Sequence, residues 1–340
     1  MHELQWLALA MLPATLLSGA IHEAGHVLAG SACGFSFAWV RVGPFWLKQE
    51  DRRWRLRFQP VSLLSFDGAS RVAPHRLGFS RARAIALVAG GPLLSLICAG
   101  LALLVYRWPF AGHPFLRALL YDFSLISLAA SLLSLLPFDT GSRLTDGYML
   151  RELATTASRA RRFWYWLQVS AHWTDGVLPR DWDRAALATA CSLEDGSKLE
   201  ARVRQLAYYA ALDRDEIGEA RLHLQRAQQL RARLPVESAL LLDLDAAWFD
   251  AAVEGRPEAA RTRLNQTRTQ VHGWQRVAVR IAETAVLLAE GRTEDAHKSA
   301  RQASEILDVM RWRPLVATEF DWLESHHPAL RDNAGGDNLC

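Results

Sequence analysis

Long runs of apolar residues dominate the first 150 positions of the chain, and they predict membrane-spanning helices. Residues 4–30, 84–106 and 115–136 form three such runs, separated by polar segments. A helix needs ~20 predominantly apolar residues to cross a bilayer, and each run reaches that length. We therefore expect three transmembrane helices in the N-terminal part of the chain.

Between the first two runs, the pattern changes to a period of two residues. Residues 53–58 alternate basic and apolar side chains strictly, residues 35–42 do so weakly, and Gly43-Pro44 marks a turn. This period is typical of a half-exposed β-strand. We expect a small β-hairpin or meander between the first two runs, with its basic face near lipid head groups and not on nucleic acid.

From residue 197 onward, apolar residues recur with the period of amphipathic helices, and the helices form pairs. The turns within the pairs resemble one another, and Gly255 and Gly291 are 36 residues apart. Paired helices at such a period are typical of a tetratricopeptide-like solenoid, and an irregular helical bundle is the alternative. The expected helices are residues 197–212 and 214–230, 236–254 and 256–269, and 274–290 and 292–307.

These patterns together predict a mostly α-helical fold with two domains. A polytopic membrane domain of three core helices carries the small β insertion, and a cytoplasmic helical-repeat domain follows it. A chain of 340 residues is too long for one small core, which agrees with this division. The expected segments are residues 1–155 for the membrane domain, 156–190 for an interfacial linker, 191–332 for the repeat domain and 333–340 for a disordered tail.

Basic residues are distributed unevenly around the three apolar runs. Residues 35–83 hold ten of them, whereas the connection at 107–114 holds only Arg107. The positive-inside rule then places the first loop and the C-terminal half in the cytoplasm and the N-terminus outside. The N-terminus lacks the basic region of a signal peptide, so we expect the first run to remain as an anchor. The chain is expected to be a multi-pass protein of the bacterial inner membrane.

Composition changes this picture little. The net charge is +3 and hydrophobic residues make up 50% of the chain, and neither value is extreme. The four cysteines have no paired spacing and no Cys-x-x-Cys motif, so they indicate neither a disulfide framework nor a thiolate metal site.

The candidate chemistry lies inside the first apolar run, in the sequence His22-Glu23-Ala24-Gly25-His26. On a helix, His22 and His26 project from one face because they are four residues apart. That geometry suits two ligands of a tetrahedral zinc ion. Glu23 can take a proton from a metal-bound water. Ionisable side chains in a membrane span are energetically expensive and usually functional, which favours a zinc site.

A catalytic zinc site generally has three protein ligands and a water. Two carboxylates, Asp139 and Asp146, follow the third apolar run. Each has a purely structural alternative, Asp139 as a turn residue and Asp146 as the N-cap of the helix that begins at Gly147.

These motifs resemble the site-2 protease family of intramembrane zinc metalloproteases. That family has His-Glu-x-x-His on its first core helix, Gly-Pro-Leu on the second and an Asn-x-x-Pro…Asp-Gly element after the third. The second element is similar to residues 91–93, and the third to residues 134–147. The resemblance covers residues 1–155, and the rest of the chain lies outside it.

The resemblance implies specific roles for four residues. His22, His26 and Asp146 would hold Zn²⁺, and Glu23 would be the general base. The chain departs from the family pattern at Ser95 and Ser134, where the family commonly has Asn, and in a longer spacing between its Pro and Asp. These departures concern the handling of substrate more than the binding of zinc.

The expected function is that of an intramembrane zinc endopeptidase. It would hydrolyse a peptide bond in or near a transmembrane segment of a membrane protein, in regulated intramembrane proteolysis, while the repeat domain binds a protein partner. The alternative is a non-catalytic membrane scaffold that keeps a structural zinc and acts through its repeats. Glu23 favours the enzyme, because a structural zinc site has no use for a general base.

Overall fold

The structure is a computed structural model that describes residues 2–50, 53–58, 68–74, 80–107, 113–139, 144–174, 176–310 and 313–332. The chain divides into two compact units, Met1–Trp164 and Tyr165–Cys340. It passes from the first unit to the second within helix α5 (Ala157–Thr174).

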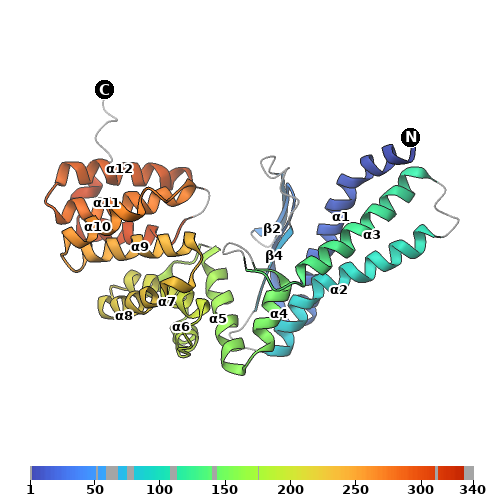
Figure 1. Ribbon diagram of the computed structural model, residues 1–340, viewed down its shortest axis with the longest axis horizontal. Coiled ribbons are helices and arrows are strands. Elements are labelled where there is room, and N and C mark those ends of the chain that lie inside the picture. The colour runs from blue at the N-terminus through green and yellow to red at the C-terminus, as the bar shows by residue number, and fades with distance from the viewer. Residues whose placement is uncertain are drawn as a thin grey trace. The chain divides into compact units, whose positions relative to one another are not determined.

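Three long helices form the frame of the first unit. They are α1 (His2–Ala32), α2 (Arg81–Tyr106) and α3 (Pro114–Ser134), and each packs against the other two (Figure 1). Within the part of the chain that the structure describes, these three helices are long and apolar enough to cross a membrane, so the three expected spans are confirmed.

Glycines let α1 and α2 approach backbone to backbone. A Cβ atom added to Gly25 would lie only 2.8 Å from the carbonyl carbon of Gly90. In a membrane, where lipid is as apolar as the side chains, such close approach is a main source of helix association. Gly25 belongs to the segment that carries the two histidines, so this contact brings α2 directly against them.

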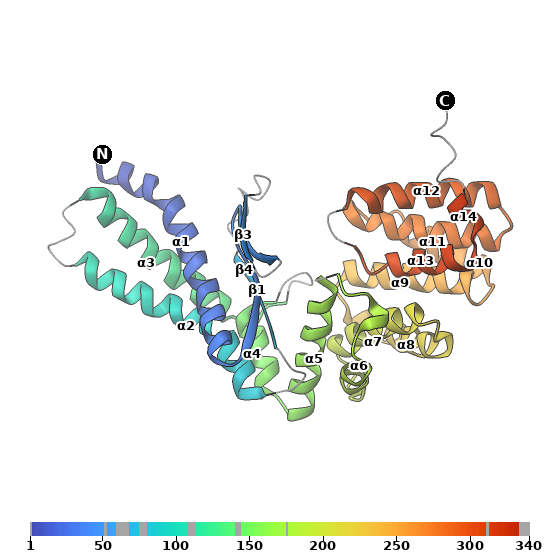
Figure 2. The same cartoon turned by 180° about the vertical axis from the view of Figure 1, so that it is seen from behind.

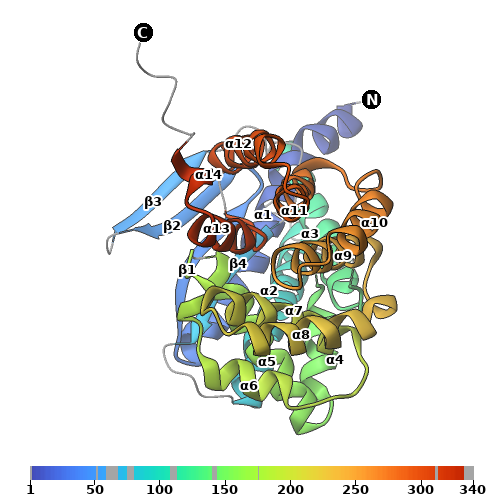
Figure 3. The same ribbon diagram turned by 90° about the vertical axis from the view of Figure 1, so that its left-hand side faces the viewer.

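The residues between α1 and α2 form a four-stranded antiparallel sheet with the strand order β3-β2-β1-β4 (Figure 3). The strands are β1 (Phe35–Val42), β2 (Phe45–Glu50), β3 (Arg53–Phe58) and β4 (Gly68–Pro74). The expected β structure between the first two spans is confirmed. Strand β4 follows the alternating segments in the sequence and pairs with the other side of β1. Both β1 and β4 contact α1, which brings the sheet to the candidate site.

A short helix follows the third span and completes the first unit. This helix, α4 (Asp146–Ala154), packs against α2. Its N-terminus is tied to the end of α3, because a Cβ atom on Gly147 would lie 3.0 Å from the Cα atom of Leu135. Glycine at this position therefore sets how closely α4 approaches the end of the third span.

The second unit is helical in its described residues, and its longer helices pack in consecutive pairs. The pairs are α7 with α8, α9 with α10, and α11 with α12. The helices are α6 (Arg184–Cys191), α7 (Lys198–Asp213), α8 (Ile217–Gln229), α9 (Val236–Ala252), α10 (Pro257–Thr267), α11 (Arg276–Ala289), α12 (Thr293–Val309), α13 (Ala317–His326) and α14 (Ala329–Asp332), with short 3₁₀ turns at Pro179–Asp181, Arg231–Arg233 and Gly273–Gln275.

The turns inside the three helix pairs share one backbone feature. Each contains a residue in the left-handed region, with φ of 58° at Asp215, 62° at Gly255 and 75° at Gly291. Glycine adopts this region without strain, and Asp tolerates it better than most residues do. The similarity of the turns in the sequence therefore has a common conformational cause.

Helix α13 was not foreseen from the sequence pattern. It packs against α7 and α11 (Figure 2) and contributes Phe320 and Leu323 to the apolar core of the unit. The core around it also contains Trp248, which makes an edge-on contact with Trp322 at a centroid distance of 5.4 Å. These contacts make α13 part of the packed interior.

A buried polar cluster joins α7, α9 and α13. The Tyr208 hydroxyl donates to Glu319 at 2.7 Å, and the Tyr209 hydroxyl donates to Asp245 at 2.6 Å. Gln205 donates to the other oxygen of Asp245 at 2.7 Å. Asp245 is 0% exposed and Glu319 is 1% exposed. Burial raises the pKa of Asp245 to about 7, and burial together with the charge of Asp245 raises the pKa of Glu319 well above its ordinary value.

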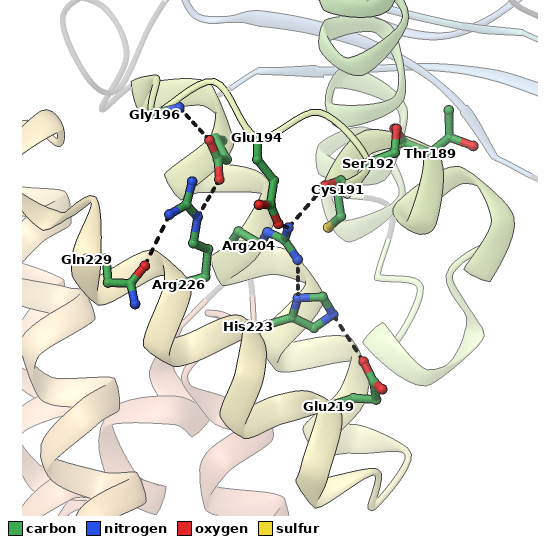
Figure 4. A network of polar contacts seen from close by, with 11 residues as sticks. Thr189, Cys191, Ser192, Glu194, Gly196, Arg204, Glu219, His223, Arg226 and Gln229 are labelled. Carbon is green, nitrogen blue, oxygen red and sulfur yellow. Dashed lines mark hydrogen bonds and ion pairs between the residues drawn. The ribbon is translucent and has the colours of Figure 1, made fainter.

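A second polar network ties α6 to α7 and α8 (Figure 4). Arg204 donates to the carbonyl oxygen of Cys191 at 3.1 Å, to Glu194 at 2.6 Å and to Nδ1 of His223 at 3.2 Å. Because a guanidinium only donates, Nδ1 of His223 is the acceptor in this pair. Burial and the neighbouring Arg204 lower the pKa of His223, so the neutral ring is the stable form.

Candidate active site

Helix α1 places the two motif histidines side by side. The Nε2 atoms of His22 and His26 are 3.3 Å apart, and the ring centroids are 5.0 Å apart. This follows from the four-residue spacing on a continuous helix. The two Nε2 atoms therefore face a common point, and the carboxylate of Asp146 lies beside that point.

Helix α4 brings Asp146 to that place. One carboxylate oxygen of Asp146 lies 3.1 Å from Nε2 of His22, and the other lies 3.4 Å from Nε2 of His26. Asp146 is 6% exposed. Its alternative role as an N-cap belongs instead to Thr145, whose hydroxyl accepts the backbone N–H of Tyr148 at 3.3 Å. The Asp146 side chain is therefore free to face the histidines.

The other carboxylate considered from the sequence lies elsewhere. Asp139 follows the third span and forms an isolated antiparallel bridge with Leu144. Thr145 then returns to the end of the span, where its hydroxyl donates to the carbonyl oxygen of Leu136 at 2.5 Å.

His22, His26 and Asp146 have the dimensions of a zinc site. Ligand atoms at ~2.0–2.1 Å from a tetrahedral ion are ~3.3–3.4 Å from one another. The distances of 3.3, 3.1 and 3.4 Å between the three groups agree with that spacing. In the described residues, these three are the group of His, Cys, Asp and Glu side chains whose ligand atoms converge, all within 4.8 Å of one another.

The proton positions also fit a cation. Nδ1 of His26 lies 3.0 Å from the carbonyl oxygen of Leu87, which only accepts, so Nδ1 carries the proton. In the neutral ring, Nε2 of His26 is then a lone-pair donor that faces an anionic carboxylate. A cation between these groups would be bound by all of their lone pairs at once. Two imidazoles and a carboxylate are donors that suit zinc.

Helix α2 holds both imidazoles from behind. Leu87 receives the hydrogen bond from His26, and Ser95 places its hydroxyl oxygen 3.3 Å from Nδ1 of His22. Between them, Gly91 leaves room for the His26 ring, because a Cβ atom there would lie 2.6 Å from Cε1 of the ring. Pro92 lies inside α2 and has no N–H to donate back along the helix.

Strand β4 covers the fourth motif residue, Glu23. The Glu23 side chain is 6% exposed and hydrogen bonds to Ser70. A Cβ atom on Gly68 would lie 2.5 Å from Oε1 of Glu23, so glycine is needed for this close approach. Glu23 also interacts electrostatically with His22, His26 and Asp146, which places it beside the cluster.

Sequence comparison identifies the family. A sequence model of peptidase family M50 matches residues 10–293, which is most of the chain. The chain therefore belongs to peptidase family M50, the family of the site-2 proteases, and the resemblance to that family is confirmed. The family is one of intramembrane metallopeptidases that depend on zinc. The match also extends past residue 155, to the beginning of α12, which is farther than the motifs indicated.

Neither a comparison with curated proteins nor one with solved structures gives a match.

Two contacts of the site were missed in the sequence. Ser70 and Gly68 touch Glu23, but they lie in a segment with no strong periodicity, so no signal pointed to them. In the sequence, Ser95 stands out only as a departure from the family's Asn, and its contact with His22 is not predicted. Its position one turn after Gly91, which lies against the His26 ring, is the signal that could have indicated this contact.

Proposed function

We propose that this chain is an intramembrane zinc endopeptidase that hydrolyses a peptide bond in or near a transmembrane segment of a membrane protein. The observation that carries this proposal is the convergence of His22, His26 and Asp146 beside a buried Glu23, with both histidines and Glu23 on a helix able to span a membrane. Membership of a family of intramembrane metallopeptidases supports the same reaction class.

In this proposal, His22, His26 and Asp146 hold the ion, and Glu23 is the catalytic base. Bound zinc would supply Lewis acidity and favour the deprotonation of water near neutral pH. Glu23 accepts the proton that the attacking water loses and returns it to the departing amine. Ser70 donates a hydrogen bond to the Glu23 carboxylate and holds it in one orientation during this exchange.

The substrate must present an extended backbone, because a helix hides its carbonyl groups in its own hydrogen bonds. Strand β4 offers a place for such a segment. Among the described strands, β4 lies at the edge of the sheet, and its Ser70 contacts Glu23. A substrate segment that pairs with the free edge of β4 would pass beside the base, as in other cases of strand addition.

We place the chain in a bacterial inner membrane, with the N-terminus outside and the sheet and second unit in the cytoplasm. The uneven distribution of basic residues supports this orientation. A reporter fused after residue 330 should then be cytoplasmic, and a tag within residues 107–114 should be accessible from outside. Protection of the second unit from added protease in inside-out vesicles would contradict this orientation.

We also propose that residues 191–332 form a tetratricopeptide-like solenoid that binds a protein partner and so regulates cleavage. The three packed helix pairs and the left-handed residue shared by their turns support this interpretation.

The alternative, a scaffold with a structural zinc, is not favoured. A structural site is closed by four protein ligands, whereas only three ligand groups converge among the described residues. A scaffold would also not need the buried carboxylate of Glu23 beside a site with three ligand groups, because a structural zinc requires no base.

The decisive experiment is the Glu23→Gln variant in native membranes. The amide keeps the shape of the side chain and removes its basicity. Zinc should stay bound, because its three ligands remain. Cleavage should fall by ~10²–10⁴, the contribution of a positioned acid–base group. The uncut substrate should accumulate on the enzyme, where mass spectrometry identifies it.

Glu258→Gln is the matched control, because it removes one carboxylate from an exposed position in α10. This variant should cleave normally. A Glu23→Gln variant that holds zinc and cleaves at the normal rate would refute the proposed mechanism.

A further inference from the structure

Helix α2 presents three consecutive turns of one face to the histidines of α1. Leu87, Gly91 and Ser95 are each four residues apart, so they lie above one another on that face. Leu87 accepts the hydrogen bond of His26, Gly91 makes room for the His26 ring, and Ser95 lies 3.3 Å from Nδ1 of His22. One face of α2 therefore contacts both imidazole rings.

We propose that Ser95 is a positioning residue, which fixes the tautomer and the orientation of His22 as a metal ligand. This inference rests on the zinc site of the proposed function and assigns the residue that supports it. When Nδ1–H of His22 donates to the Ser95 hydroxyl, Nε2 keeps its lone pair and faces Asp146. The carbonyl of Leu87 has the same role for His26.

Burial makes the hydroxyl of Ser95 hard to replace. Ser95 is 1% exposed, so water does not reach the position and cannot take over the hydrogen bond. Without the hydroxyl, the Nδ1–H of His22 would lose its acceptor, and the ring would turn or adopt the other tautomer. In either case, Nε2 no longer offers its lone pair to the ion at the same place. Partners of this kind typically change metal affinity by ~10–100-fold.

Zinc affinity of the full chain in detergent micelles tests this inference, measured by competition with a chelator of known strength. Ser95→Ala should weaken zinc binding by ~10–100-fold. Ser95→Thr, which keeps the hydroxyl, should bind zinc nearly as the wild type does. Cobalt(II) alone gives a second readout, because the visible spectrum of the cobalt-loaded protein reports ligand geometry. This spectrum should change in Ser95→Ala and not in Ser95→Thr.

Ser127→Ala is the matched control. Ser127 is also a fully buried serine in a membrane-spanning helix, but its hydroxyl donates to Ser18 at 2.9 Å and touches no proposed ligand. Zinc affinity and the cobalt spectrum should be unchanged in this variant. The change from hydroxyl to methyl is the same, so the comparison separates support of a ligand from general packing.

Three results would overturn the inference: wild-type zinc affinity and cobalt spectrum in Ser95→Ala, an equal loss of affinity in Ser127→Ala, or no recovery in Ser95→Thr. The last two would assign the effect to packing. A wild-type chain that binds no stoichiometric zinc is a different result, since it would reject the metal site of the proposed function itself.

Discussion

Asp245 makes the stability of the second unit depend on pH in an unusual direction. Its carboxyl group is 0% exposed and is held by Tyr209 and Gln205, while Glu319 lies in the same cluster. The charged groups that shift these two pKa values are acidic: Asp243 raises the pKa of Asp245, and Asp245 raises that of Glu319. Asp243 itself pairs with Arg231.

The magnitude follows from the shift of the pKa. Burial raises the pKa of Asp245 from 3.8 to about 7 in the folded protein. The folded state therefore binds the proton more tightly, so this contribution to stability is fully present below pH ~4 and is lost as pH rises through ~7. At ~1.4 kcal/mol per pKa unit, the total is ~4 kcal/mol, of which ~2 kcal/mol is lost between pH 5 and pH 7.

Amide hydrogen exchange of α9 in the intact chain measures this effect. After correction for intrinsic exchange rates, the free energy of opening of α9 should fall by ~2 kcal/mol between pH 5 and pH 7 in the wild type. In Asp245→Asn, the amide still accepts the Tyr209 hydrogen bond but does not titrate, so the part of the dependence that comes from Asp245 should disappear and only the part that comes from Glu319 should remain. If the two proteins show parallel pH dependence, then Asp245 is not the titrating group, and the reasoning from its burial is wrong.

Two further predictions concern the metal site. Asp146→Ala should strip zinc from the purified protein because it removes one of three ligands, whereas Asp139→Ala should leave the zinc content unchanged; metal loss in Asp139→Ala alone would show that the wrong carboxylate was assigned. Gly91→Ala should weaken zinc binding by at least ~10-fold, because the new Cβ displaces the His26 ring. This is the loss of metal affinity that is typical when a group that orients a metal ligand is changed. Gly100→Ala on the same helix, where a Cβ meets nothing within 4 Å, should bind zinc normally, and equal loss in both variants would point to helix packing instead.

The sequence predicted those features that depend on local periodicity. The three spans were expected from length and hydropathy, and His22 and His26 share a face because of their spacing alone. Asp146 is different, because it is 124 residues from His22 along the chain. Its approach depends on the packing of α4 against α2 and on the contact of Gly147 with Leu135, and only the family resemblance pointed to it.

The periodicity of the sequence does not predict contacts between segments that are far apart along the chain. Tyr208 and Glu319 are 111 residues apart, and no period connects them. Strand β4 pairs with β1 across a long connection, so the contact of Ser70 with Glu23 was not predictable. Helix α13 has only ten residues, too few for a clear amphipathic signal, and its burial follows from the shape of the helices around it.

The three spans contribute to the metal site in different ways. Helix α1 supplies the imidazoles, α2 holds them from behind, and the end of α3 carries α4 with its carboxylate. In the proposed enzyme, the free energy of metal binding is therefore also free energy of helix association within the bilayer. Linkage is reciprocal, so any change that separates the spans, such as a thinner bilayer or a substrate helix entering between them, should lower the affinity for the ion. Removal of the ion with a chelator should in turn loosen the packing of all three helices.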